Sequence, residues 1–277
     1  MHSALPPFLL IFDLDGVLYR GSEVVPGAPE ALAALRPAGF HVAFLTNNSW
    51  SLASDFAAKL NGLGIPASDE EVYTSSMAAA AVTLERHGPS RVLAVGGPGL
   101  RHYLTEAGHT VTMTADPPAP VDVVVAGIDW NFTYETLSRA QEALLDGATF
   151  YATNLDPRYP FEAGRFKPGA GSLIAAISTA SGVEPVVIGK PSSLSIELLM
   201  EQYGVKPKQT LVIGDQLATD ILAGNRAGCR TALVTTGVNS ATEAEKTHGV
   251  ARPTYVFDSP LALRDALITE ELLVVRS

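Results

Sequence analysis

Two aspartates separated by a single residue lie near the beginning of the chain, in the sequence Asp13-Leu14-Asp15-Gly16. They follow the apolar run Phe8-Leu9-Leu10-Ile11-Phe12, which is typical of a buried strand. Ligands of an open parallel sheet bind beyond the carboxyl ends of its strands, and Gly16 lets the chain turn as soon as the strand ends. The two carboxylates could therefore hold a hard cation, although a polar strand end followed by a turn fits the same residues. A calcium loop does not fit, because its third oxygen ligand and its glutamate are missing.

A second polar turn follows the next apolar run. Thr46-Asn47-Asn48-Ser49 comes after His41-Val42-Ala43-Phe44-Leu45 and opens a predicted helix, which Ser49 caps and which runs to about Leu60. A hydroxyl, amides and backbone N–H groups at the beginning of a helix form an anion site. An ordinary capping turn explains the same residues without any ligand.

Two more polar turns occur in the last third of the chain. Gly189-Lys190-Pro191 follows the apolar Val186-Val187-Ile188, so Lys190 could neutralise a phosphate, but a solvated lysine fits as well. Asp215 follows the strand candidate Thr210–Ile213 in the sequence Gly214-Asp215-Gln216-Leu217-Ala218-Thr219-Asp220. Alternatively, Asp215 caps the next helix and Asp220 is a solvated residue within it.

The four motifs together favour chemistry over these local alternatives. If each motif follows a strand of one parallel sheet, all four converge on a single crevice. They would bring carboxylates for a hard cation, a hydroxyl, backbone donors and one ammonium group to the same place. This combination suits phosphoryl transfer, in which catalysis consists largely of positioning and of neutralising charge.

The elements that must position these motifs alternate between strands and helices. This β-α-β-α order predicts an α/β fold with a parallel sheet covered on both faces. Beyond the strands already named, the expected elements of this part are Ala28–Leu35, Ala218–Ala227, Thr231–Val234 and Thr254–Phe257. The middle of the chain has its own alternation, with Arg91–Val95, Val121–Ala126, Thr133–Leu145 and Ser172–Ser181. We therefore predict a discontinuous core domain of residues 1–75 and 187–277, and a second domain inserted at 76–186.

The composition restricts the partners and the compartment. The 277 residues carry a formal net charge of −10, which argues against a nucleic acid polymer as partner. The single cysteine, Cys229, excludes an internal disulfide and a cysteine-based metal cluster, and it suits a reducing cytoplasm. The apolar run from Leu5 to Phe12 lacks the features of a signal peptide and is too short to span a bilayer. We expect a cytoplasmic protein with no membrane partner.

In this order, the motifs resemble the four motifs of the haloacid dehalogenase-like (HAD) hydrolase superfamily. The residues that carry the resemblance are Asp13-Leu14-Asp15-Gly16-Val17-Leu18, Thr46-Asn47-Asn48, Lys190, Gly214-Asp215 and Asp220. The insert between the second and third motifs is similar to a C2-type cap. Its segments Ala152–Pro160 and Gly164–Gly169 resemble the NagD-like group, which includes p-nitrophenyl phosphatases, phosphoglycolate phosphatase and pyridoxal phosphatase. The resemblance covers nearly the whole chain and implies a Rossmann-like parallel-sheet core with an inserted α/β cap.

The resemblance also implies roles for single residues. Asp13 would attack phosphorus and form an aspartyl-phosphate, while Asp15 would protonate the leaving alkoxide and then deprotonate water. Mg²⁺ would be held by Asp13, the backbone carbonyl of Asp15, and Asp215. The other motif residues would bind phosphate (Thr46 and the backbone of Asn47), lie near the substrate (Asn48), restrain Asp13 and the phosphate (Lys190), or support their neighbours (Gly16, Gly214, Asp220). Three cap residues would either touch the substrate or shape a turn over the active site: Asn154, Asp156 and Arg158.

We therefore expect a magnesium-dependent phosphatase that hydrolyses small phosphomonoesters through an aspartyl-phosphate on Asp13. Two alternatives remain open at this stage. One is a phosphotransferase or mutase that uses the same intermediate, and the other is a non-catalytic protein that binds a phosphorylated metabolite. The expected partner is a small phosphorylated metabolite, and a homodimer formed through the cap is left open.

Overall fold

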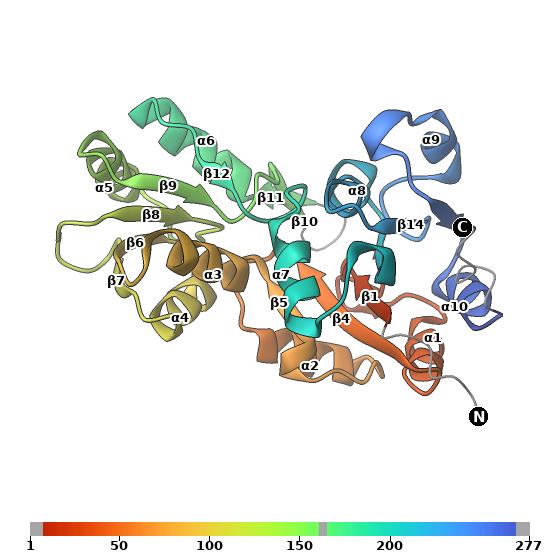
Figure 1. The fold of residues 1–277 in the computed structure, drawn as a ribbon. Coiled ribbons are helices and arrows are strands. Elements are labelled where there is room, and N and C mark those ends of the chain that lie inside the picture. Colours follow the sequence, from red (N-terminus) through yellow and green to blue (C-terminus); the bar gives the residue numbers. More distant parts are fainter. Residues whose placement is uncertain (1–7, 161–164, 270–277) are drawn as a thin grey trace. The chain divides into compact units, whose positions relative to one another are not determined.

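The computed structural model describes residues 8–160 and 165–269, and Figure 1 shows its fold. Contacts divide the chain into two compact units. The first unit comprises Ser54–Tyr73 with the described parts of Met1–Thr46 and Lys190–Ser277, and the second comprises Asn47–Ala53 and Thr74–Gly189. The domain bounds at 75/76 and 186/187 remain a prediction. The boundaries between the two units, at Tyr73/Thr74 and Gly189/Lys190, lie within three residues of these positions. The short segment Asn47–Ala53 also belongs to the second unit.

The first unit is built on a six-stranded sheet with the order β15-β14-β13-β1-β4-β5. Its strands are β1 (Phe8–Phe12), β4 (Phe40–Thr46), β5 (Val72–Thr74), β13 (Thr210–Gly214), β14 (Arg230–Val234) and β15 (Tyr255–Phe257). The strands from β15 to β4 are parallel to their neighbours. The N-terminal β1, red in Figure 1, therefore lies in the same sheet as the blue β14 from the last part of the chain.

The central strand β1 is buried on both faces of the sheet, which explains why its sequence, Phe8–Phe12, is apolar throughout. Leu9, Leu10 and Ile11 are each 0% exposed. Because successive residues of a strand point to opposite faces, both faces of the sheet must be covered at this strand.

The helices of this unit are α1 (Ala28–Leu35), α2 (Ala53–Gly62), α7 (Leu194–Tyr203), α8 (Leu222–Arg226), α9 (Ala241–Lys246) and α10 (Pro260–Ile268). A two-stranded hairpin, β2 (Tyr19–Arg20) and β3 (Glu23–Val24), follows the first motif.

The second unit has a parallel sheet of its own, with the order β12-β9-β8-β6-β7. Its strands are β6 (Arg91–Val95), β7 (Thr110–Met113), β8 (Val123–Ala126), β9 (Thr149–Ala152) and β12 (Val186–Val187), and a separate antiparallel pair is formed by β10 (Arg158–Pro160) and β11 (Phe166–Pro168). The helices are α3 (Ser75–His87), α4 (Pro98–Glu106), α5 (Tyr134–Leu145) and α6 (Ala170–Ser181). The predicted α/β fold, with a parallel-sheet core and an inserted α/β domain, is thus confirmed, and the second sheet is parallel as well. Among the described residues, no helix is both long and apolar enough to cross a membrane.

Three local predictions were wrong. The helix expected from Ser49 begins at Ala53, because the buried Ser49 hydroxyl oxygen instead accepts a hydrogen bond from the Ile128 N–H at 3.1 Å. The helix expected at Ala218–Ala227 is a π-helical turn, η4 (Leu217–Ile221), followed by the short α8. The apolar residues before Lys190 form β12, which pairs with β9, so Lys190 does not follow a strand of the first sheet. Gly164 and the beginning of the run from Leu5 lie outside the described residues.

Replacing Leu10 by alanine should lower the free energy of unfolding by about 2–5 kcal/mol, because it removes a fully buried side chain and leaves a cavity. Urea unfolding measured by far-UV circular dichroism checks this value. The control is Val256→Ala on the edge strand β15, where the side chain is 41% exposed. That change should stay within about 0.5 kcal/mol. Equal losses in the two variants would contradict the assigned burial of β1.

The thiol of Cys229 should react slowly with a disulfide reagent such as DTNB at pH 8. The residue is 7% exposed, and burial raises the pKa of its thiol to about 12, so almost no thiolate exists at that pH. Absorbance at 412 nm measures the labelling rate, and the same protein in urea provides the fast reference. Rapid stoichiometric labelling of the native protein would refute the prediction.

Candidate functional site

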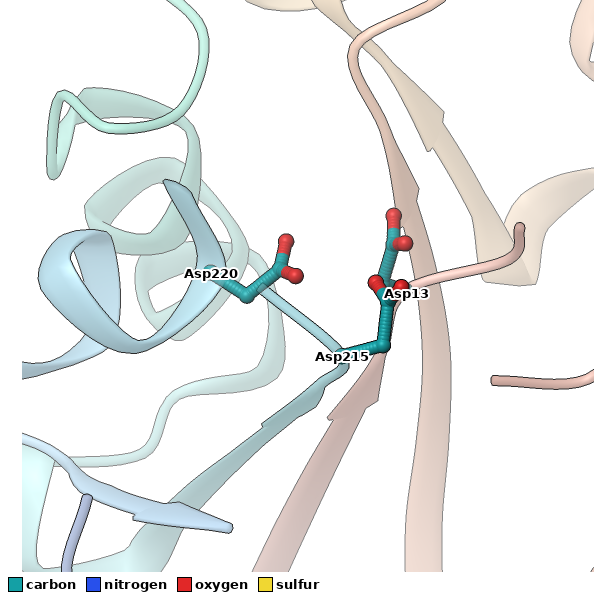
Figure 2. A group of neighbouring side chains, drawn as sticks. All are labelled: Asp13, Asp215 and Asp220. Carbon is teal, nitrogen blue, oxygen red and sulfur yellow. The ribbon is translucent and has the colours of Figure 1, made fainter. Parts of the chain in front are cut away.

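Three aspartates of the first unit come together at one end of its sheet. Asp13 follows β1 and Asp215 follows β13, and these strands end together because Phe12 pairs with Ile213. The backbone N–H of Asp13 also donates to the Ile213 carbonyl oxygen at 2.8 Å. Asp220 reaches the same region from the π-helical turn η4. One carboxylate oxygen of each aspartate lies within 4.8 Å of the others, and Figure 2 shows the three side chains converging.

The ammonium group of Lys190 links two of these carboxylates. Its Nζ atom lies 2.6 Å from Asp13 Oδ1 and 2.6 Å from Asp220 Oδ1. It also donates to the carbonyl oxygen of Leu45, near the end of β4, at 3.3 Å. Lys190 is 3% exposed, so this ion-pair network lies almost entirely out of water. The first motif therefore meets Lys190 and the last motif, as the sequence predicted, although Lys190 follows a turn and not a strand of this sheet.

The charges of this cluster do not balance. Burial raises the pKa of Asp13 well above its usual value, although Lys190 opposes the shift. Burial alone would lower the pKa of Lys190, but the adjacent Asp13 and Asp220 carboxylates outweigh it and raise that pKa. Burial, followed by the negative charge of Asp220, raises the pKa of Asp215 to about 7. Three carboxyl groups share one ammonium group, so ionising all of them is unfavourable unless a bound cation compensates the negative charge.

Asp215 and Asp220 differ in their hydrogen bonds. Asp215 Oδ2 accepts from the Val238 N–H at 2.7 Å, while Oδ1 is buried and has no hydrogen-bond partner in the described structure. Both oxygens of Asp220 are occupied, Oδ1 by Lys190 and Oδ2 by the Gln216 N–H at 3.0 Å. A buried carboxylate oxygen without a donor fits a hard divalent cation, and Asp215 offers one.

Three glycines pack so closely against Asp215 and Asp220 that no larger residue would fit in their place. A Cβ atom on Gly16, whose φ is +81°, would lie 2.3 Å from Asp215 Oδ2, and one on Gly214 would lie 2.1 Å from Asp220 Cβ. A Cβ atom on Gly237 would lie only 1.9 Å from Asp215 Oδ2. Sequence reasoning named Gly16 and Gly214 but missed Gly237. The available signal was its position in a polar turn, three residues after the predicted strand that ends at Val234.

Asp15 differs from Asp13 because its side chain is exposed to solvent. The surrounding protein still raises the pKa of Asp15 by removing part of its water, and the positive charge of Lys59 opposes this shift. Lys59, on α2, lies with its Nζ atom 3.5 Å from the centroid of the Tyr19 ring. Burial lowers the pKa of Lys59. Sequence reasoning did not identify Lys59, because nothing local connects α2 with the first motif.

The second motif is divided between the two units. Thr46 is buried at the end of β4, whereas Asn47 and Asn48 belong to the second unit. The Asn48 side-chain oxygen accepts from the backbone N–H groups of Trp50 at 2.9 Å and Ser51 at 3.3 Å. The assignment of Asn48 to the vicinity of the substrate remains a prediction.

The three cap candidates lie on or before β10. Asn154 is 3% exposed, whereas Arg158 is exposed and has its guanidinium carbon 5.8 Å from the Phe166 ring centroid. Asp156 accepts a hydrogen bond from the Asn47 side chain at 3.0 Å. Asn154 and Asp156 thus contact residues of their own unit, and contact of any of the three with substrate remains a prediction.

Comparisons with known proteins agree with this geometry. Residues 10–110 match the family described as haloacid dehalogenase-like hydrolase, and residues 187–263 match a HAD-hydrolase-like family. The chain is 38% identical over 249 residues to the 5′-nucleotidase YutF of Bacillus subtilis (strain 168), covering 90% of this chain and 94% of that protein. The predicted superfamily is therefore confirmed.

Two solved structures are similar over nearly the whole chain. NagD from the Escherichia coli K-12 strain has a TM-score of 0.84 with 32% identity, and the match covers 92% of this chain and 98% of that one. The glycerol phosphate phosphatase Rv1692 from Mycobacterium tuberculosis, in complex with magnesium, has a TM-score of 0.85 with 35% identity, covering 93% and 76%. Rv1692 has also been solved in complex with calcium. Sequence and fold agree, and this chain belongs to the HAD-like hydrolase superfamily, in its NagD-like group.

Proposed function

We propose that this chain is a magnesium-dependent phosphatase that hydrolyses small phosphomonoesters with Asp13 as the nucleophile. The observation that carries the proposal is the buried cluster in which Lys190 holds Asp13 and Asp220 beside the unpartnered Oδ1 of Asp215. The relatives support a small phosphate ester as substrate, because one is a 5′-nucleotidase and another a glycerol phosphate phosphatase. Since one relative is a nucleotidase and the other a glycerol phosphate phosphatase, the leaving group of the substrate differs among these proteins.

The two aspartates of the first motif divide the chemistry. Lys190 orients the Asp13 carboxylate, which attacks phosphorus as the bond to the leaving oxygen breaks, so that an aspartyl-phosphate forms. Asp15 gives its proton to the leaving oxygen, then takes a proton from the water that attacks the aspartyl-phosphate. Inorganic phosphate leaves and Asp13 is regenerated. The exposure of Asp15 supports this division, because a leaving group and a water molecule can both reach it.

The residues present fit a divalent cation. Asp13 and Asp215 would hold it, together with the backbone carbonyl of Asp15, while Asp220 keeps Lys190 in place. When bound, the cation neutralises the repulsion between a carboxylate nucleophile and an anionic substrate. Thr46, Asn47, Asn48 and Lys190 would bind or lie next to the phosphate, and Gly16 and Gly214 allow the close packing described above.

We also propose a cytoplasmic location, which the single and buried Cys229 supports. A small phosphorylated metabolite is the proposed partner. A homodimer through the second unit stays a prediction.

Asp13→Asn should abolish turnover, because an amide cannot act as the nucleophile. Asp15→Asn should leave residual activity, about 10²–10⁴-fold below wild type, because a general acid–base group is lost. Initial rates with p-nitrophenyl phosphate and with a nucleoside monophosphate, in excess Mg²⁺, check both values.

Asp258→Asn is the control for these two variants, since it makes the same change at an exposed position. It should retain wild-type rates. Wild-type-like hydrolysis by Asp13→Asn or Asp15→Asn would contradict the assignment.

Gly237→Ala should weaken Mg²⁺ affinity about 10–100-fold, as expected when the support of a metal ligand is disturbed. The added methyl group would meet Asp215 Oδ2 at 1.9 Å and displace the carboxylate. Isothermal titration calorimetry with Mg²⁺ measures the affinity. Gly62→Ala is the matched control, because nothing lies within 4 Å of its Cβ position. Unchanged Mg²⁺ affinity in a folded Gly237→Ala variant would show that Asp215 is not a ligand.

A further inference from the structure

The position of Asn47 is determined by side chains of the second unit. Asn47 directly follows Thr46, the last residue of β4. Its carbonyl oxygen accepts hydrogen bonds from Asn154 Nδ2 at 2.7 Å and from the Ser75 hydroxyl at 2.7 Å. Its own side-chain amide donates to Asp156 Oδ2 at 3.0 Å. Both the backbone and the side chain of Asn47 are therefore held by residues more than 20 positions away in the sequence.

Asn154 and Asp156 hold Asn47 as a closed ring of hydrogen bonds. The Asn154 side-chain oxygen accepts from the Asp156 N–H at 3.0 Å, while its amide nitrogen donates to the Asn47 carbonyl. Asp156 completes the ring by accepting from the Asn47 side chain. Asn154 is 3% exposed, and both its side-chain oxygen and its amide nitrogen form hydrogen bonds within this ring. A buried polar network of this kind, with each member bonded, fixes one local conformation.

The same loop also contacts the residue before Lys190. The Gly189 N–H donates to the Thr153 carbonyl oxygen at 2.9 Å. A Cβ atom on Gly189 would lie 2.3 Å from that oxygen and 2.7 Å from Asn47 Oδ1, so the Asn47 side chain packs directly against this glycine. The loop Thr153–Asp156 thus touches Asn47 and Gly189. These two residues are covalently adjacent to Thr46 and Lys190.

We propose that Asn154 and Asp156 are positioning residues for the phosphoryl group: they hold Asn47 and act on the reaction through it, without contacting the leaving group. The inference rests on the proposed function and deepens it. It predicts that disturbing the ring lowers kcat/KM by the same factor for every phosphate ester. It also predicts weaker binding of inorganic phosphate, which has no leaving group.

The main variant is Asp156→Ala, which removes the acceptor for the Asn47 side chain. A hydrogen bond to a charged group corresponds to roughly a 10–100-fold effect, so kcat/KM should fall by about that factor. The fall should be equal for p-nitrophenyl phosphate and glycerol 3-phosphate, and the dissociation constant of inorganic phosphate should rise in parallel. Asp156→Asn should retain most activity, because an amide oxygen can still accept from Asn47. Asp146→Ala, an exposed aspartate of the same unit, should behave like wild type.

A double-mutant cycle separates positioning from general destabilisation. If Asp156 acts through the Asn47 side chain, Asn47→Ala combined with Asp156→Ala should lose little more kcat/KM than Asn47→Ala alone. Thermal unfolding of each variant verifies that it is folded. Additive losses in the cycle would overturn the inference, and so would a loss that the lowered melting temperature alone explains.

The leaving group distinguishes positioning from substrate contact. A loss in Asp156→Ala that differs between the two esters, with unchanged affinity for inorganic phosphate, would show that Asp156 touches the leaving group and would overturn the inference. A wild-type protein that binds inorganic phosphate but hydrolyses no ester would instead refute the proposed function. In that case, weaker phosphate binding by Asp156→Ala would still support the role of the ring.

Discussion

A single ammonium group, that of Lys190, stands between two carboxylates in a region almost closed to water. It lies 2.6 Å from both Asp13 and Asp220, and it is 3% exposed. Buried charges persist only when they are paired, so the side chain of Lys190 and both carboxylates must keep their places together. Asp215 adds a third carboxyl group that has no ion-pair partner among the described residues, and its pKa is raised to about 7 by burial and by the charge of Asp220. The cluster is therefore arranged for an additional cation, and the proposed chemistry follows from that imbalance.

The fold makes this charge density possible by bringing backbone very close to the carboxylates. Two parallel strands in register end at Asp13 and Asp215, and glycines at positions 16, 214 and 237 leave room where any side chain would collide. The second unit contributes in a different way, since its loop Thr153–Asp156 holds Asn47 immediately after Thr46. Asn47, which directly follows the last residue of β4, thus takes its local geometry from a hydrogen-bonded ring with Asn154 and Asp156 of the second unit.

Much of this could be predicted from the sequence, for reasons that are local. The apolar run before Asp13 and the strand before Asp215 are each visible in a few residues, and parallel strands bring their ends together. The nearness of Lys190 was also expected, but for the wrong reason, because the apolar residues before it pair in the other sheet. The partners of Ser49, the packing of Gly237 on Asp215 and the ring around Asn47 could not be predicted. Each depends on residues that are distant in the sequence, and no periodicity records which of them will meet.

The most direct measurement of the central claim is the chemical identification of the phosphorylated residue. A phosphate ester labelled with ³²P, mixed with the enzyme and Mg²⁺ and quenched in acid within milliseconds, should leave a covalent label that hydroxylamine removes. Mass spectrometry of the digested protein should place that label on the peptide containing Asp13. Label on any other residue would contradict the account, and so would a burst of labelled inorganic phosphate with no covalent intermediate at any quench time.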